Sequence, residues 1–194
     1  MTLPNLITIA RILLVPFVVW LILIGRADAA FLVFVIAGIS DAVDGALARQ
    51  MNWRSDLGAY LDPLADKTLL VSIYVTLAIT GEVPVWLTIV IVSRDVLIVG
   101  GVVIAWMLSA PTAMQPRWIS KINTTMQIVF AAVVLGDLAF GLELTLVRYI
   151  LMWTVGALTV VSAAVYLVDW TQHMGESEAA TTSTIPPRRE RDKR

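Results

Sequence analysis

The sequence has 194 residues, of which 58% are hydrophobic and 15% are charged, and its mean hydropathy is +0.82. A typical soluble domain is about half apolar and about a quarter charged, so this composition predicts a membrane protein. The net charge of −1, the absence of cysteine and the single histidine exclude a broadly basic nucleic-acid surface, disulfides, cysteine nucleophiles and metal clusters built on cysteine or histidine.

Six apolar stretches are long enough to cross a membrane as helices, because about 20 residues span about 30 Å of hydrocarbon. In chain order they run over residues 5–25, 28–49, 62–80, 84–108, 120–140 and 146–170. The connections between them are short and rich in Gly, Pro and charge, as is typical of tight helical hairpins. Since lipid-exposed backbone must satisfy its own hydrogen bonds, we expect an all-α, polytopic bundle of six transmembrane helices.

Lysine and arginine are distributed unequally between the two sides of this expected bundle. The side that holds the second and fourth connections and the C-terminus carries most of them, and the opposite side carries only Arg26 and Arg148. Positive residues in short loops favour the cytoplasmic side. Both termini and a polar site on that side are therefore predicted to face the cytoplasm, in a bacterial inner membrane.

The end of the chain differs in composition from the rest. Residues 171–194 lose apolar content and gain Ser, Thr, Pro and charge, which is typical of disordered segments. We predict one six-helix domain over residues 1–170 and a disordered cytoplasmic tail over residues 171–194. The basic end of this tail either touches anionic lipid or serves only for solubility.

Aspartates are concentrated around the second connection. Asp41 and Asp44 are three residues apart, and Asp62 and Asp66 are four apart, so each pair is expected to share one helical face. Four carboxylates in a low dielectric repel one another unless they are protonated or bind a divalent cation. Hard cations such as Mg²⁺ or Mn²⁺ prefer carboxylate oxygen, and a pair of them can clamp a diphosphate during phosphoryl transfer. Taken singly, each aspartate is better explained as a helix cap or a loop residue; taken together, with Asp41 about two turns inside a span, they are not.

Small and basic residues accompany the aspartates. Gly45, Ala48 and Gly58, the last expected in the loop before the third helix, would let a nucleotide approach the backbone closely. Arg49 would place a fixed positive charge beside a phosphate.

The spacing of these eight residues, D-x2-D-G-x2-A-R-x8-G-x3-D-x3-D from Asp41 to Asp66, resembles the complete signature of the CDP-alcohol phosphatidyltransferase family. The resemblance implies a six-helix membrane enzyme, usually a homodimer, with its site open to the cytoplasmic leaflet. It implies that the four aspartates bind two Mg²⁺ or Mn²⁺ ions and that Asp66 is also the general base. It further implies that Gly45, Ala48, Arg49 and Gly58 hold the CDP portion of CDP-diacylglycerol.

Polar residues outside the signature are candidates for the rest of the site. Asn5, Thr8 and Arg11 recur at three-residue steps and either line the cytoplasmic cavity, with Asn5 and Thr8 near the CDP portion, or serve as caps and snorkelling groups. Arg94 either is neutralised by the adjacent Asp95 or binds an anion. Together with Lys121 and Arg11, it is a candidate ligand for the phosphate of the acceptor.

Several outer motifs are similar to one branch of the family, the CMP-forming cardiolipin synthases. They are "PNLITIAR", "LDPLADK", "SRD" and "ISKINTTMQ". This similarity implies phosphatidylglycerol as the acceptor and cardiolipin as the product. The neighbouring branch, the phosphatidylglycerophosphate synthases, uses glycerol 3-phosphate and remains an alternative, because both acceptors carry a phosphate.

Three classes of membrane protein compete with this interpretation. An ion-coupled transporter places its carboxylates near the midplane between related halves, whereas here they gather at one surface and the two halves are dissimilar. A membrane prenyltransferase also binds a diphosphate through aspartates, but with different spacings. A non-catalytic scaffold has no use for four convergent aspartates.

Overall fold

The computed structural model describes the backbone of residues 3–51, 56–107 and 118–183, and the side chains of residues 13–40, 67–101 and 118–168. In these ranges the chain forms six helices and no strands, which confirms the all-α prediction. The helices are α1 (Leu3–Leu23), α2 (Ala27–Met51), α3 (Asp56–Ile79), α4 (Val85–Met107), α5 (Trp118–Phe140) and α6 (Thr145–Ser183).

Two helix boundaries differ from the sequence prediction by more than two residues. Helix α3 begins at Asp56, so Gly58 lies inside the helix and not in the preceding loop. An aspartate is favourable at a helix N-terminus because it offsets the positive end of the helix dipole. Helix α6 continues through residues 171–183, where the composition predicts disorder. Extending an existing helix needs no new nucleus, and the alanines and glutamates in this segment are good helix formers. Residues 184–194 lie outside the described part of the chain.

Each of the three described hairpin turns contains a glycine in the left-handed region. The φ angles are +76° at Gly25, +81° at Gly81 and +62° at Gly141. At the first turn, the amide of Arg26 donates to the carbonyl of Leu21 at 2.9 Å, which is the bond that closes a helix end after a left-handed residue. These glycines therefore allow tight antiparallel connections α1–α2, α3–α4 and α5–α6.

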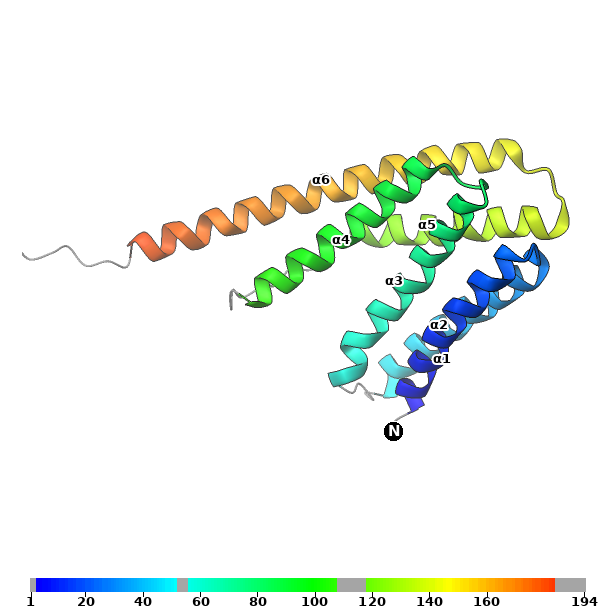
Figure 1. Cartoon of the computed structure of the whole chain (residues 1–194). Helices are drawn as coiled ribbons and strands as arrows, with labels where there is room; N and C mark the ends of the chain where they lie inside the picture. The colour runs from blue at the N-terminus through cyan, green and yellow to red at the C-terminus, as the bar shows by residue number, and fades with distance from the viewer. Residues whose placement is uncertain (1–2, 52–55, 108–117, 184–194) are drawn as a thin grey trace, which may run out of the picture.

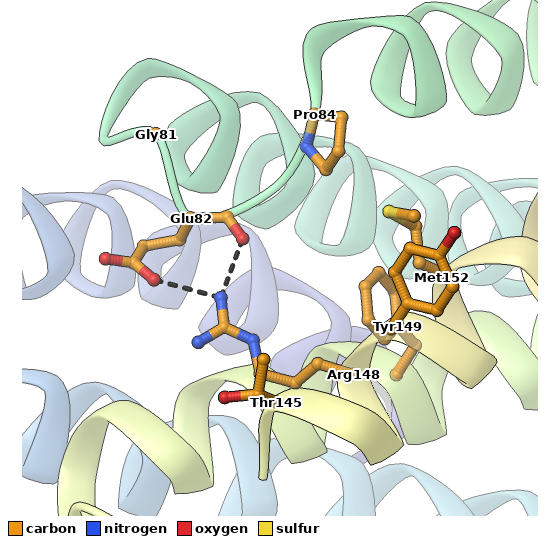
Figure 2. A pocket seen from close by; sticks show the side chains of 8 residues that line it. Gly81, Glu82, Pro84, Thr145, Arg148, Tyr149 and Met152 are labelled. Atoms are coloured by element: carbon orange, nitrogen blue, oxygen red, sulfur yellow. Dashed lines mark hydrogen bonds and ion pairs between the residues drawn. The ribbon is translucent and has the colours of Figure 1, made fainter. Parts of the chain in front are cut away.

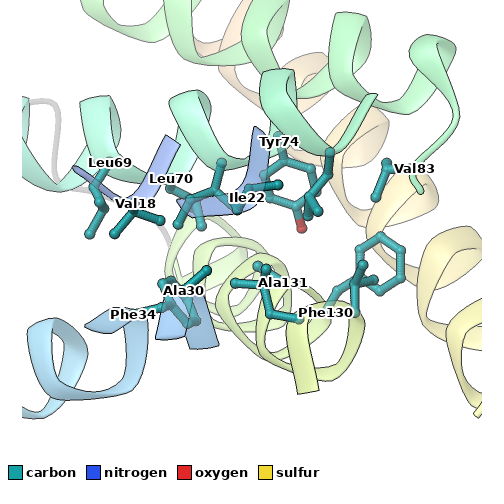
Figure 3. Close-up of a cluster of buried hydrophobic side chains, with 14 of the residues drawn as sticks. Val18, Ile22, Ala30, Phe34, Leu69, Leu70, Tyr74, Val83, Phe130 and Ala131 are labelled. Carbon is teal, nitrogen blue, oxygen red and sulfur yellow. The ribbon is translucent and has the colours of Figure 1, made fainter. Parts of the chain in front are cut away.

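The helices pack around one apolar core. Helix α1 contacts α2 and α3, α3 contacts α4 and α5, and α5 and α4 each contact α6. Helix α2 lies against α5, so that the first and second halves of the chain close on each other (Figure 1). Buried side chains from all six helices form the core, including Val18, Phe34, Tyr74, Leu87, Ala131 and Val155. Figure 3 shows part of this cluster between α1, α2, α3 and α5.

The outer surface of the described bundle is apolar as well. Large hydrophobic side chains are exposed on every helix, for example Trp20 at 55%, Ile36 at 53% and Ile89 at 58%. Soluble monomers rarely expose large contiguous apolar patches, so this surface is that of a membrane protein. Among the described residues, Trp118–Phe140 and Thr145–Val168 are long and apolar enough to cross a membrane. Six transmembrane spans remain a prediction.

Candidate functional site

The signature residues lie on the last turns of α2 and the first turns of α3. Helix α2 carries Asp41 and Asp44, with Gly45, Ala48 and Arg49 following, and helix α3 carries Gly58, Asp62 and Asp66. Helix α1 packs against both of these helices, and Figure 1 shows the start of α1, the end of α2 and the start of α3 at the same end of the molecule. The fold therefore brings the two signature segments to one end of the bundle.

The side chains of the signature residues lie outside the described part of the structure. The predicted metal ligands Asp41, Asp44, Asp62 and Asp66 are therefore placed by their backbone alone. The same holds for Asn5, Thr8 and Arg11 on the first turns of α1, which lie at the end of the bundle that carries the signature. Their predicted roles remain predictions.

A network of charged side chains begins directly after the last signature aspartate. Lys67, which follows Asp66 on α3, donates through Nζ to Oδ1 of Asp95 on α4 at 2.6 Å. The same oxygen accepts from Nη1 of Arg94 at 2.7 Å. One carboxylate oxygen thus joins two cations, and the side chain of Asp95 is only 8% exposed. The negative charge of Asp95 therefore offsets part of the positive charge of Lys67 and Arg94 in a place from which water is largely excluded.

Arg94 extends this network to α5 and α6. The residue is only 2% exposed. Its Nε and Nη2 donate to Oγ of Ser162 at 3.3 and 2.9 Å, and Nη2 also donates to Oγ of Ser120. All three guanidinium nitrogens are therefore bound to protein oxygens. The geometry is that of a structural cross-link between α4, α5 and α6.

A second set of polar contacts lies one turn deeper along the same faces of α5 and α6. The amide nitrogen of Gln127 donates to Oγ1 of Thr159 at 3.3 Å. The hydroxyl of Thr159 can donate to Oδ1 of Asn123 at 3.0 Å or to the carbonyl of Val155 at 2.7 Å. Nδ2 of Asn123 is buried and has no hydrogen-bond partner. A row of polar contacts therefore joins α5 to α6 inside an otherwise apolar bundle.

The two described candidates for the acceptor phosphate differ in accessibility. Arg94 is buried and fully engaged. Lys121 is exposed at the start of α5, with Nζ 5.6 Å from the ring centroid of Trp118. An exposed ammonium group is free to meet an incoming anion, whereas Arg94 would first have to release a protein partner. Both assignments remain predictions.

The sequence interpretation missed four members of the polar network. It assigned no role in the site to Lys67, Ser120, Thr159 or Ser162. On α6, buried Thr159 and Ser162 follow buried Val155 at helical spacing, so polar residues on the buried face of a span are a signal that could have found them. Intramembrane polar residues usually face the bundle interior.

The opposite end of the bundle has its own charged group. Arg148 at the start of α6 binds Oδ2 of Asp137 at 3.0 Å and both the carbonyl and a carboxylate oxygen of Glu82, at 2.7 and 2.9 Å. Figure 2 shows the contacts with Glu82 beside a pocket of about 340 Å³, which Phe130 and Met152 also line. This pocket lies between the α3–α4 turn and the start of α6, away from the signature segments.

The donor set of the signature fits a divalent metal ion, since carboxylate oxygens are the ligands that Mg²⁺ and Mn²⁺ prefer. Among the residues whose side chains the structure describes, no group of three or more His, Asp or Glu could hold a metal ion. The carboxylates that could do so belong to the signature, on helix turns that the fold brings to one end of the bundle. A metal site there remains a prediction.

Comparison with known proteins gives consistent matches. A family model described as CDP-alcohol phosphatidyltransferase matches residues 1–161. The chain is similar to the cardiolipin synthases (CMP-forming) of Rattus norvegicus and Homo sapiens, with 35% identity over 179 residues, which is 84% of this chain and 59% of each relative. It is also similar to CDP-diacylglycerol–glycerol-3-phosphate 3-phosphatidyltransferase 1, chloroplastic, of Oryza sativa subsp. japonica, with 33% identity over 191 residues, which is 89% of this chain and 58% of that protein. The chain thus spans less than two thirds of the length of these relatives.

Proposed function

The chain belongs to the CDP-alcohol phosphatidyltransferase family, and from this we propose that it transfers the phosphatidyl group of CDP-diacylglycerol to an alcohol and releases CMP. The observation that carries the proposal is the extent of the family match. It covers residues 1–161, which include every position of the aspartate signature and the whole Lys67–Asp95–Arg94 network.

We propose phosphatidylglycerol as the acceptor and cardiolipin as the product. The similarity to the rat and human proteins named cardiolipin synthase supports this choice. The rice relative, whose name gives glycerol 3-phosphate as its acceptor, favours a second candidate. In that case the product would be phosphatidylglycerophosphate. Both acceptors present a hydroxyl near a phosphate, so the same cationic groups could orient either one.

In the proposed reaction Asp66 takes the proton of the acceptor hydroxyl. The hydroxyl oxygen then forms a bond to the lipid-side phosphorus, the bond from that phosphorus to the bridging diphosphate oxygen breaks, and CMP leaves with the electron pair. The signature aspartates would hold Mg²⁺ or Mn²⁺, which when bound supplies positive charge to the diphosphate. Gly45, Ala48, Arg49 and Gly58 would align the CDP portion, because alignment of the reacting groups lowers the barrier strongly.

Helix α5 supplies the more accessible cation for the acceptor. Lys121 is exposed near the α4–α5 connection, and a flexible ammonium group can reach an anion without breaking a buried contact. Arg94 would act mainly through the position of its helix, since Asp95, Ser120 and Ser162 bind all of its nitrogens. Arg11, Asn5 and Thr8 would complete the cavity from α1.

The protein would work within a lipid bilayer as a homodimer with both termini in the cytoplasm. The excess of lysine and arginine on the side of the second and fourth connections supports this orientation. A bacterial inner membrane is the proposed location, with six membrane spans and the tail after residue 170 on the cytoplasmic side.

The test supplies the purified protein with labelled CDP-diacylglycerol and either phosphatidylglycerol or glycerol 3-phosphate, with and without a metal chelator. We expect CMP release and labelled cardiolipin with phosphatidylglycerol, and loss of both with the chelator. Lipid product from glycerol 3-phosphate alone would replace the proposed acceptor by the second candidate. If CMP release did not depend on the divalent metal, the proposed role of the aspartates would be wrong.

A further inference from the structure

Lys67 connects the signature segment of α3 to the interior of the bundle. It directly follows Asp66, and its Nζ lies 2.6 Å from Oδ1 of Asp95 on α4. Lys67 shares a helical face with Leu70, Tyr74 and Leu77, and all three of these side chains are buried. The cation thus stands at the end of the buried stripe of α3 that lies nearest to the signature aspartates.

The partner of Lys67 is itself held firmly. Asp95 also binds Nη1 of Arg94 at 2.7 Å, and Arg94 in turn binds Ser162 on α6 at 2.9 Å and Ser120 on α5. Through one ion pair, the turn of α3 that follows the signature is linked to three other helices.

A second polar contact between α3 and a neighbouring helix lies deeper in the bundle. Oη of Tyr74 donates to the carbonyl of Gln127 at 2.9 Å. At 1.5 Å per residue, Tyr74 is about 12 Å along the helix from Asp66, whereas Lys67 is about 1.5 Å away. Without the Lys67–Asp95 pair, α3 would lose a directional contact with α4 at the residue that follows Asp66.

We propose that Lys67 is a positioning residue for the phosphatidyl transfer. By its ion pair with Asp95 it fixes the rotation of α3 about its axis, and so the placement of the carboxylates on the preceding turns. The inference rests on the proposed function. A displacement of about 1 Å in a reacting group can lower the rate on the order of 10²-fold. The loss of one contact beside Asp66 is therefore expected to lower the rate of transfer.

The main variant is Lys67→Met. Methionine keeps an unbranched stem and good helix propensity, and Asp95 keeps its contact with Arg94, so the buried arginine is not left unpaired. We expect kcat for CMP release to fall on the order of 10- to 100-fold, with little change in KM for CDP-diacylglycerol. Lys67→Arg should restore most of kcat, because a guanidinium can also reach Asp95. Arg26→Met removes a cation from an exposed ion pair with Asp28 at the opposite end, and this control should keep wild-type kcat.

A double-variant comparison tests whether Lys67 acts through Asp95. Asp95→Asn removes the charge but keeps an acceptor oxygen for Arg94, and it should lower kcat as well. The double variant Lys67→Met/Asp95→Asn should be no slower than the slower single variant, because both remove one interaction. All rates are measured well below the unfolding midpoint of each variant in the same detergent.

Each alternative result overturns a defined claim. Wild-type kcat in Lys67→Met, or a decrease explained fully by loss of folded protein, overturns the positioning role and leaves the proposed function intact. Failure of Lys67→Arg to restore activity, or additive losses in the double variant, indicates direct contact of Lys67 with substrate and also overturns the role. Absence of CMP release from the wild-type protein overturns the proposed function and this inference together.

Discussion

Ser162 helps to stabilise the buried positive charge of Arg94. Its Oγ accepts from Nε and Nη2 of Arg94, which is almost completely buried. Hydrogen bonds to charged groups contribute about 1.5–3 kcal/mol, and a buried donor left without a partner is costly. We expect Ser162→Ala to lower the free energy of unfolding by about this amount, measured as a shift of the thermal or denaturant midpoint in detergent micelles.

The matched control for this variant is Ser93→Ala. Ser93 directly precedes Arg94 on α4 and is exposed, so its removal should change the midpoint very little. If both alanine variants lost stability equally, the contact between Arg94 and Ser162 would not contribute as the geometry indicates.

The residues of the site differ in how far sequence alone could predict them. The aspartate signature lies within one short stretch of the sequence, from Asp41 to Asp66, so its position at the end of α2 and the start of α3 follows from spacing. The sequence leaves two roles open for Arg94, and its full set of buried contacts supports neutralisation by Asp95. Ser120 and Ser162 could not be recognised in the same way, because their roles depend on how α4, α5 and α6 pack.

At the scale of helices and turns, one glycine in a turn and one inside a helix allow a paired test of the assigned secondary structure. Gly81 has φ +81°, and a side-chain carbon added there would have no neighbouring atom within 4 Å; Gly38 lies inside α2, also in open space. Alanine at position 81 meets no clash but is strained by about 1–2 kcal/mol in the left-handed region. Alanine at position 38 should instead stabilise the helix by about 0.5–1 kcal/mol. Thermal midpoints should move in opposite directions, and a shift of the same sign in both would contradict the assignment of the α3–α4 turn.

The sequence predicts the number and order of the helices well, because each contains an apolar stretch of sufficient length. Two helix ends differ from the prediction by more than two residues. Helix α3 begins at Asp56 and α6 continues to Ser183, since residues that are polar by composition can still extend a helix that its apolar part has already nucleated. Composition therefore predicts the apolar part of a helix better than it predicts the residues at which the helix begins and ends.

At the scale of the whole molecule, the described charged side chains lie towards both ends of the bundle. At the end with the three described hairpin turns, both arginines are paired: Arg26 with Asp28 at 3.1 Å, and Arg148 with Glu82 and Asp137 at 2.9 and 3.0 Å. At the signature end the exposed Lys121 has an aromatic neighbour, and Lys67 is paired with Asp95 at 2.6 Å. The orientation proposed from the distribution of lysine and arginine in the sequence places the signature end in the cytoplasm.

The absence of cysteine makes this orientation directly testable. Leu142 lies in the α5–α6 turn and is 53% exposed, and Trp118 lies at the start of α5 and is 80% exposed. In intact cells, a membrane-impermeant maleimide should label Leu142→Cys and should label Trp118→Cys only after permeabilisation, because the two positions lie at opposite ends of α5. The unmodified chain, which offers no thiol, is the control for background labelling. The reverse pattern would invert the proposed topology, and equal labelling of both variants in sealed cells would show that α5 does not separate two compartments.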